Sequence, residues 1–447
     1  MIDEQQKAGG SRKPQILKGF RDYPPDQMRM RQEVIGRFRS VFESFGFEPL
    51  DTPAIEYLEV LTGKAGENEK LMYAFSDHGD RRVGLRYDLT VPLARFVAMH
   101  QSEIVMPFRR YHIAPVWRAE KPQRGRFREF WQCDADIVGS PSPVADAEII
   151  AILGAALTSV GLPRFSIAVS HRQLLARIAA WAGVAEDRAG QVYRSVDKLA
   201  KIGPDSVIEE LVGSGIDLVA ATRVLDALSM ENAHSSPLER IAENLAGDPI
   251  AQDAIGELRE IFAVLPSMGV SDAQVRFDPT LARGLDYYTG PVFEAIVEEP
   301  KVGSVAGGGR YENLIGTFAN RSITATGVSL GLERILEVVT EFQLIAARTS
   351  AADVLIISAN SDSAAAASIA SLVRAEGWRV ELGLQPKRSV GEQFKFGSRK
   401  GIPIALVVGV ASVAADTVRI KRLRSGEEVE VSGEAAVTQI REWLKQE

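Results

Sequence analysis

The stretch from Val116 to Gly139, VWRAEKPQRGRFREFWQCDADIVG, carries the side chains best suited to bind charged ligands. It places an arginine-rich loop between two apolar, strand-like segments, and two carboxylates, Asp134 and Asp136, follow that loop. Guanidinium groups match phosphate and carboxylate oxygens two at a time, and carboxylates bind cationic or polar groups. The segment therefore suits a site for phosphate on one side and a cationic or polar ligand on the other. The alternative is a solvated hairpin without a function.

Further arginines stand near the ends of predicted strands. Arg283 begins RGLDYY, and Arg334 lies at the start of a predicted helix in GLER. A single arginine of this kind is more often an ordinary surface or helix-end charge. As a set, they suit a reaction that must gather and orient negative charge. The arginines around the loop itself are Arg109, Arg110, Arg118, Arg124, Arg126 and Arg128.

Other kinds of chemistry find little support in the sequence. The five histidines form no i, i+4 pair with a third ligand, so we expect no metal site built on side chains. The single cysteine, Cys133, lies in the apolar and aromatic stretch FWQCDAD, which favours a buried, unreactive thiol. The sequence has no G-x-S-x-G nucleophile motif.

Two glycine-rich segments resemble phosphate-binding loops without matching them. LTGKAG lacks the first glycine and the final Ser or Thr of a P-loop, and AGGGRYE lacks dinucleotide-binding spacing. Gly307 to Gly309 therefore indicate either a close backbone approach, by another chain segment or a flat ligand, or a plain turn.

Composition bounds the class of protein. The 447 residues are 45% hydrophobic and 25% charged, which is typical of a soluble protein of two or three domains. One cysteine allows no internal disulfide, and no apolar run is long enough to cross a bilayer, so we expect a cytoplasmic protein without a membrane role. The formal charge of −7 argues against binding of nucleic acid, DNA included, through bulk charge.

Local patterning divides the chain into three regions. Residues 1–170 mix helices, such as Met28 to Phe45, with short strands, and this α+β pattern returns over 271–345. The intervening residues 171–270 are patterned as helices and read as an insertion. Residues 350–447 alternate strands and helices, which predicts a small α/β domain with a partly parallel sheet.

The elements expected in that last region follow a regular order. Strands are predicted at DVLIIS, WRVEL and PIALVV, with helices over 363–376 and 389–400 between them. A hairpin around Ser425 and Gly426 and a helix ending at Trp443 complete it. From Asp353 onward the chain has thirteen basic against twelve acidic residues, which weakly favours an RNA-facing module.

Several of these segments resemble the signatures of one enzyme family. The stretch from Val116 to Gly139 is similar to motif 2 of class II aminoacyl-tRNA synthetases, TGVSLGLERI to motif 3 and GFEPLDTPAIE to motif 1. LARGLDYYTGPVFE, AGGGRYENLIG and GFRDYPP resemble the signatures of histidyl-tRNA synthetases. The resemblance implies a class II catalytic domain, an antiparallel sheet flanked by helices, with a helical insertion and a C-terminal α/β anticodon-binding domain.

The resemblance also implies roles for individual residues. Catalytic roles fall to Arg118, on the α-phosphate, and Arg283, facing the reacting carboxylate. Histidine would be bound by Asp88, Thr90, Gln132, Asp136, Arg283, Tyr287 and Tyr288. ATP would be bound by Arg118, Glu120, Arg126 and Arg334. tRNA would be bound by Gln123 and Arg124 in the motif 2 loop and by Lys387, Arg388 and Arg399 in the C-terminal domain.

The activity that the resemblance implies is histidine–tRNA ligation. ATP and L-histidine would form an adenylate, with Mg²⁺ on the phosphates, and tRNA(His) would receive the histidine. A homodimer built on motif 1 is implied as well. The alternative is a catalytically inert relative that regulates ATP phosphoribosyltransferase or senses tRNA. The retained arginines and histidine-pocket residues favour the active enzyme.

Overall fold

The computed structural model of the chain forms two compact units. It describes residues 14–62, 70–162, 164–229, 236–281, 287–297, 299, 302–319, 321–346, 348–359, 363–385, 388–409 and 417–446. The N-terminal unit comprises the described residues up to Asp22 and Arg31–Ile345, and the C-terminal unit comprises Tyr23–Met30 and the described residues from Ala346 onward. No helix in these ranges is long and apolar enough to cross a membrane.

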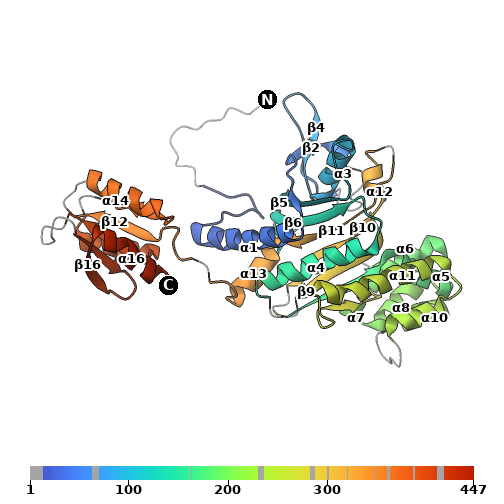
Figure 1. The fold of residues 1–447 in the computed structure, drawn as a ribbon. Coiled ribbons are helices and arrows are strands. Elements are labelled where there is room, and N and C mark those ends of the chain that lie inside the picture. The colour runs from blue at the N-terminus through green and yellow to red at the C-terminus, as the bar shows by residue number, and fades with distance from the viewer. Residues whose placement is uncertain are drawn as a thin grey trace. The chain divides into compact units, whose positions relative to one another are not determined.

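An eight-stranded sheet organises the N-terminal unit, with the order β1-β5-β6-β11-β10-β9-β7-β8 (Figure 1). The strands are β1 (Glu48–Pro49), β5 (Phe108–Trp117), β6 (Glu129–Val138), β7 (Phe165–His171), β8 (Val275–Phe277), β9 (Tyr288–Val297), β10 (Gly303–Tyr311) and β11 (Ala325–Gly331). Neighbouring strands are antiparallel except at the two edges, where β1 runs parallel to β5 and β8 parallel to β7. This confirms the predicted α+β class with an antiparallel sheet.

Helices cover one face of this sheet. The helix α4 (Pro143–Ser159) packs on β6, β9, β10 and β11, and α13 (Leu332–Glu341) follows directly from β11. Successive strand residues point to opposite faces, so the buried Cys133, Ala135 and Ile137 of β6 lie on the face opposite to that of Gln132, Asp134 and Asp136. The second set is therefore free to line a ligand site.

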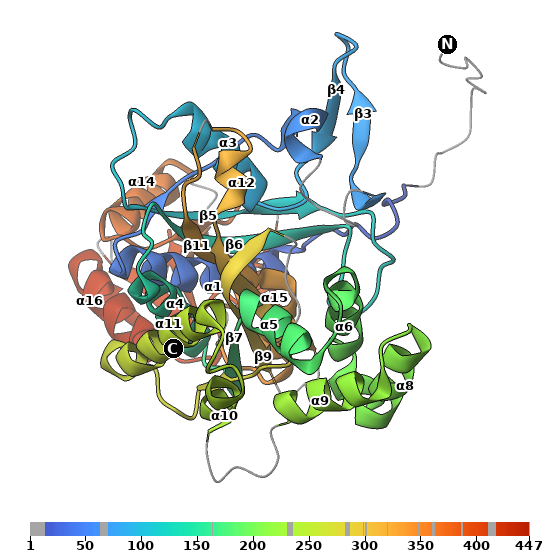
Figure 2. The same ribbon diagram turned by 90° about the vertical axis from the view of Figure 1, so that its right-hand side faces the viewer.

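A smaller three-stranded sheet, with the order β2-β4-β3, rises from the same unit (Figure 2). Its strands are β2 (Ile55–Tyr57), β3 (Ala74–Ser76) and β4 (Arg82–Leu85). Short helices α2 (Leu58–Leu61), α3 (Thr90–Met99) and α12 (Asn313–Gly316) pack nearby around buried side chains such as Tyr87 and Val97. The chain between β4 and α3 is thereby held against the large sheet.

Every described element between Arg172 and Met268 is helical, as the sequence predicts. The α-helices are α5 (Arg172–Ala182), α6 (Ala189–Val196), α7 (Leu199–Ile202), α8 (Pro204–Gly213), α9 (Leu218–Leu228), α10 (Pro237–Asn244) and α11 (Pro249–Val264). Asp217 and Asp248 cap α9 and α11 by accepting backbone N–H bonds. The helix predicted over Met28 to Phe45 is observed as α1 (Pro25–Ser44).

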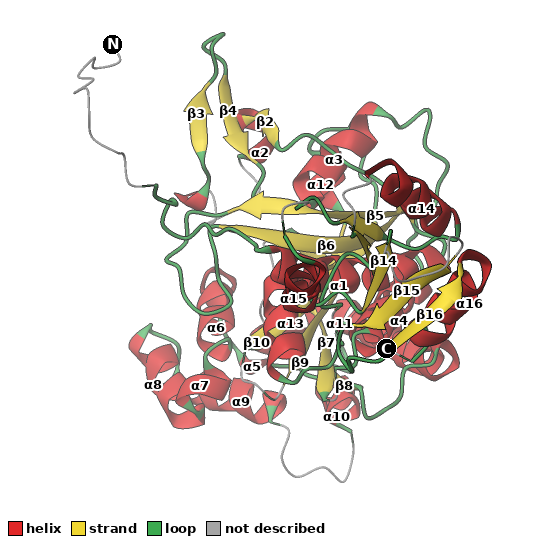
Figure 3. Ribbon diagram, turned by 90° about the vertical axis from the view of Figure 1, so that its left-hand side faces the viewer, coloured by secondary structure: helices red, strands yellow, loops and turns green. Residues whose placement is uncertain are grey.

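The C-terminal unit contains a five-stranded sheet with the order β13-β12-β14-β15-β16. Figure 3 labels its strands β14, β15 and β16 and its helices α14, α15 and α16. Its elements are β12 (Val354–Ser358), α14 (Ser363–Ala375), β13 (Val380–Leu382), α15 (Val390–Lys400), β14 (Ile404–Val408), β15 (Thr417–Arg422), β16 (Glu428–Ser432) and α16 (Gly433–Leu444). The first three strands in that spatial order are parallel and the last two antiparallel. The predicted order of strands and helices is confirmed.

Buried side chains on both faces explain this layering. Val354 and Ile356 of β12 pack in a cluster with Ala370 of α14 and Trp443 of α16. Leu355 and Ile357 form a second cluster that packs against α15. A continuous apolar run is typical of a strand covered on both faces by helices.

Gly307 to Gly309 lie within the strand β10, so the plain-turn interpretation is wrong and the close backbone approach is confirmed. A Cβ atom at Gly308 would come within 2.2 Å of the Gly327 carbonyl oxygen and 2.3 Å of the Phe293 ring. A Cβ atom at Gly327, which lies opposite Gly309 on β11, would come within 2.0 Å of the Asp136 carboxylate. Gly308 and Gly327 are therefore required by contact with neighbouring strands, whereas Gly307 is not.

We expect Gly308→Ala to lower the free energy of unfolding by about 1–3 kcal/mol, because the added methyl group must displace backbone as well as Phe293. Gly307→Ala is the matched control, since its Cβ atom would meet nothing closer than 3.8 Å. Urea unfolding of both variants measures the difference. Equal stability of the two variants would contradict this account of the strand.

Candidate active site

A cavity of about 370 Å³ opens on the face of the large sheet that carries Gln132, Asp134 and Asp136. Its lining includes ten residues for which the sequence predicts histidine or ATP binding: Asp88, Thr90, Arg118, Glu120, Arg126, Gln132, Asp136, Tyr287, Tyr288 and Arg334. These residues are dispersed over nearly 250 positions of sequence, between Asp88 and Arg334. The fold therefore brings together, in one pocket, side chains that the sequence only suggested as a set.

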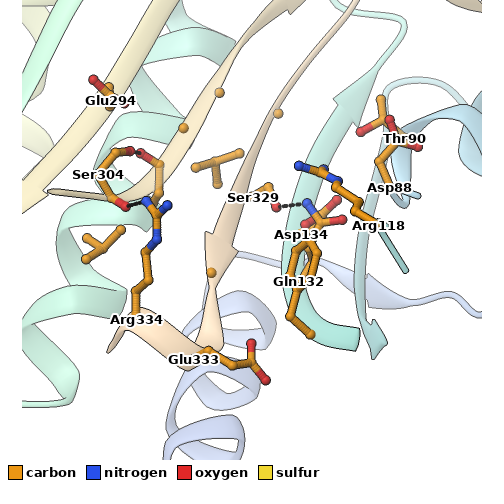
Figure 4. Close-up of a pocket in the computed structure, with 18 of the residues that line it drawn as sticks. Asp88, Thr90, Arg118, Gln132, Asp134, Glu294, Ser304, Ser329, Glu333 and Arg334 are labelled. Atoms are coloured by element: carbon orange, nitrogen blue, oxygen red, sulfur yellow. Dashed lines mark hydrogen bonds between the residues drawn. The ribbon is translucent and has the colours of Figure 1, made fainter. Parts of the chain in front are cut away.

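One end of the pocket is formed by β6 and the residues around the start of α3. Gln132, Asp134 and Asp136 alternate along β6 and line the cavity. Asp88 and Thr90 lie across from Gln132 and Asp134 (Figure 4). Asp88 Oδ1 accepts a hydrogen bond from the backbone N–H of Val91, at 3.1 Å, in the first turn of α3. That bond fixes the carboxylate while the other oxygen stays available.

Arg118 is held at this end by contacts with the protein. Its Nε donates to the carbonyl oxygen of Tyr87 at 2.9 Å, and its guanidinium lies 5.1 Å from the centre of the Phe130 ring. In Figure 4 the guanidinium of Arg118 extends from the side of Asp88 and Thr90 toward the middle of the pocket. A guanidinium fixed through Nε keeps its outer nitrogens free for the oxygens of an anionic ligand.

Asp136 is bound on both oxygens by buried partners. Oδ1 accepts a hydrogen bond from the Tyr311 hydroxyl at 2.8 Å, and Oδ2 pairs with Nη2 of Arg110 at 2.7 Å. Arg110 is fully buried, on β5 directly opposite Asp136. Burial raises the pKa of the Tyr288 phenol in the same pocket, so this phenol is neutral near pH 7. The region can offer both hydrogen-bond donors and acceptors to a polar ring.

Burial also acts on the two remaining carboxylates. Loss of hydration raises the pKa of Asp88 to about 6, against hydrogen bonds from Val91 and Thr90 and the charge of Arg118. It raises the pKa of Asp134 to about 7, although Arg110 opposes the shift. The hydrogen bonds and positive charges of the protein therefore do not fully offset the loss of hydration at either carboxylate. This state is expected of groups that bind a cation.

The opposite end of the pocket carries Arg334, Arg126 and Glu120. Nη1 of Arg334 donates to the carbonyl oxygen of Ser304, which orients the side chain toward Glu294 (Figure 4). Arg126 pairs with Glu120 at 3.5 Å. Burial, and then the charge of Arg126, lower the pKa of Arg334. Cations held close together in this way favour a polyanionic ligand.

A buried ion pair sets the position of Arg334. Glu333, at the start of α13, pairs with Arg31 of α1 at 3.0 Å and also accepts a hydrogen bond from the backbone N–H of Trp131 at 3.0 Å. All three elements are thereby tied together one residue from Arg334. This clamp links α1 to the strand of predicted motif 2 and the helix of predicted motif 3.

The predicted tRNA-binding residues that the structure describes lie outside the pocket. Gln123 and Arg124 stand in the turn between β5 and β6, where Arg124 pairs with Glu341 at 2.7 Å. Arg388 and Arg399 are exposed in the C-terminal unit, just before α15 and in its last turn. Arg283 and Lys387 fall outside the described residues.

Some groups that line the pocket or support its lining carry no specific prediction from the sequence. Arg110 and Tyr311, which bind Asp136, and Ser329, whose hydroxyl accepts a hydrogen bond from Gln132 at 2.6 Å, are examples. Strand alternation could have placed Arg110 and Ser329 on the pocket face, but their partners depend on strand order. Among the described residues, no group of three His, Cys, Asp or Glu side chains could hold a metal ion.

The chain was compared with known families and proteins. The model described as "Histidyl-tRNA synthetase" matches residues 19–335, and that described as "Anticodon binding domain" matches residues 353–443. Histidine–tRNA ligase of Aeropyrum pernix is 42% identical over 96% of this chain and 98% of its own length. That of Rhodopirellula baltica is 40% identical over 94% and 95%.

A solved structure agrees with these relatives. The crystal structure of a histidyl-tRNA synthetase from Nostoc has a TM-score of 0.86 and 29% identity, and the match covers 96% of this chain and 99% of that chain. The first family model covers the large sheet, the second covers the C-terminal unit, and the relatives extend across both. The chain belongs to the histidyl-tRNA synthetase family.

Proposed function

We propose that this protein is a histidine–tRNA ligase, which activates L-histidine with ATP and transfers it to the 3′ end of tRNA(His). The observation that carries the proposal is one pocket that combines the carboxylates of Asp88, Asp134 and Asp136 and the guanidinium of Arg118 at one end with Arg126 and Arg334 at the other. The family matches over 19–335 and 353–443 support it. Relatives named histidine–tRNA ligase at about 40% identity make the regulatory alternative the weaker one.

Charge neutralisation and alignment are the main tasks of the first step. The histidine carboxylate attacks the α-phosphate of ATP in line and expels pyrophosphate, so two anions must approach each other. Arg118 would bind the α-phosphate between the two ends of the pocket, and Arg126 and Arg334 would bind the outer part of the nucleotide. Guanidiniums fixed beforehand stabilise the charge of the transition state without reorganising. By resemblance, Arg283 would contact both reacting groups.

Selection of histidine would rest on polar groups that only its ring satisfies. Asp136 and Tyr288 would bind the two imidazole nitrogens, and Asp88, Thr90 and Gln132 the α-amino group. Tyr287 packs edge-on against Tyr288 and Tyr311, with ring centres 4.9 and 5.7 Å apart, and would close the ring site. An amino acid without ring nitrogens would leave these buried groups unpaired. That penalty should discriminate against it by a factor of about 10⁴ to 10⁵.

The nucleotide end would hold ATP with its Mg²⁺. Glu120 would contact the adenine, and Glu294 adds a carboxylate beside Arg334. Because Mg²⁺ keeps most of its water and uses substrate phosphates with one or two carboxylates, this donor set fits an ion that arrives with ATP. The ion would neutralise the phosphates, while Arg334 and Arg126 orient them.

The tRNA would use surfaces outside the pocket. Gln123 and Arg124 would face its acceptor end, and Lys387, Arg388 and Arg399 would contact the anticodon region through phosphates. The segment GFEPLDTPAIE, by its likeness to motif 1, would form a homodimer. A ligase of this kind would act in the cytoplasm.

Pyrophosphate exchange tests the proposal directly. With the purified full chain, ATP and each of the twenty amino acids, only L-histidine should drive exchange of labelled pyrophosphate into ATP. This outcome separates an active enzyme from an inert relative and identifies the amino acid. Exchange with a different amino acid, or with none, would refute the proposed function.

Tyr288→Phe should raise the KM for histidine about 10- to 100-fold, because one ring nitrogen loses its buried hydrogen-bond partner. The KM for ATP should not change. Tyr193→Phe, a tyrosine of the helical region outside the pocket, is the matched control and should behave as the parent protein. An unaltered histidine KM in the pyrophosphate exchange of Tyr288→Phe would remove this assignment.

Replacing Arg388 and Arg399 together by Ala should raise the KM for tRNA while pyrophosphate exchange is preserved. Each lost phosphate contact should also reduce the salt dependence of tRNA binding by about one unit of slope. The control is Arg441→Ala, which removes an exposed arginine of α16 that pairs with Glu376. A tRNA KM that does not differ from the control would rule out this surface.

A further inference from the structure

Three buried acceptor oxygens lie without partners at one end of the pocket. Among the described lining residues, the buried side-chain oxygens with neither a hydrogen bond nor an ion pair are Asp88 Oδ2, Gln132 Oε1 and Asp134 Oδ1. Buried acceptors of this kind are costly and therefore uncommon unless something else binds them. Together they indicate a ligand group with several N–H donors.

The remaining contacts of these side chains fix the three oxygens in place. The amide nitrogen of Gln132 donates to the Ser329 hydroxyl at 2.6 Å, so the amide oxygen is the free atom. The Ser329 side chain is also hydrogen-bonded to the Asp134 carboxylate. Asp88 is held by the backbone N–H of Val91. The acceptors are thus positioned before any ligand arrives.

We propose that Asp134 is a binding residue for the α-ammonium group of the amino acid, in a triad with Asp88 and Gln132. The inference rests on the proposed function and extends it to a residue that the resemblance does not assign. An ammonium group has three N–H donors and no acceptor, which matches three free oxygens. Asp136 fits this role less well, since Tyr311 and Arg110 already bind its two oxygens.

Charge supports the same assignment. Asp136 is balanced by Arg110 at 2.7 Å, whereas Asp134 lies 1% exposed without an ion pair of its own. Burial raises the pKa of Asp134 to about 7, which reflects this uncompensated position. A bound ammonium ion supplies the missing positive charge at short range.

A comparison of two ligands isolates the contact. L-histidine and 3-(imidazol-4-yl)propanoate share the ring and the carboxylate, and only histidine has the ammonium group. The KM for histidine and the Ki of the propanoate are measured in pyrophosphate exchange with the parent protein and with Asp134→Asn. Melting temperatures show whether the variant is folded.

Asp134→Asn should raise the KM for histidine about 10- to 100-fold, the value of one charged hydrogen bond, and leave the Ki of the propanoate and the KM for ATP unchanged. Asp136→Asn is the matched control on the same strand face, and it should weaken both ligands by the same factor. If Asp134→Asn weakens both ligands equally, or neither, the proposal is wrong. Absence of histidine-dependent exchange in the parent protein would instead refute the proposed function.

Proton release offers a second measurement that needs no variant. The ligand-free Asp134 is partly protonated below pH 7, and a bound ammonium ion lowers its pKa, so binding releases a proton and strengthens as the pH rises through about 7. The groups that face Asp134 are Asp136, Gln132, Arg110, His112, Ser329, Asp88 and Arg86. Calorimetry in buffers of different ionisation enthalpy should show more proton release for histidine than for the propanoate. Equal release would overturn the proposal.

Discussion

The absence of side chains at the centre of the large sheet is the constraint on which the pocket depends. Gly308 and Gly327 lie opposite each other's neighbours on β10 and β11, at distances that leave no space for a Cβ atom. At Gly327, that space is taken by the Asp136 carboxylate itself. The floor of the cavity is therefore made of backbone, and polar side chains from β6 extend over it. A residue larger than glycine at position 327 would displace the Asp136 carboxylate before it blocked a ligand.

Electrostatics then divides the pocket into two unlike ends. At one end, the carboxylates of Asp88, Asp134 and Asp136 lie with the guanidiniums of Arg118 and the fully buried Arg110. At the other, burial and then the nearby charge of Arg126 lower the pKa of Arg334. Such a pocket favours a ligand with a cationic group at the first end beside a ligand with anionic groups at the second. Arg118, anchored to Tyr87 at the carboxylate end, can reach the place where the two ligands meet.

Sequence patterns predicted much of this arrangement because local rules determine it. The strand-like segment expected after the arginine-rich loop is observed as β6, in which Gln132 and Asp134 line the cavity and Cys133 and Ala135 do not. The strand and helix order of the C-terminal unit follows from apolar runs between turns. Pairing across distant elements was not predictable: Arg31 with Glu333, or Arg110 with Asp136, requires knowledge of strand order and helix packing. The choice between a turn and a strand at Gly307–Gly309 depended on the same tertiary information.

The burial of Cys133 has a practical consequence. It is the only thiol of the chain, it lies beneath the pocket floor between Gln132 and Asp134, and burial raises its pKa well above the usual range. Alkylating or oxidising reagents can reach the sulfur only when β6 separates from its covering helices. The rate at which Cys133 is modified should therefore report local opening of the sheet. That rate should fall when ligands in the pocket stabilise β6.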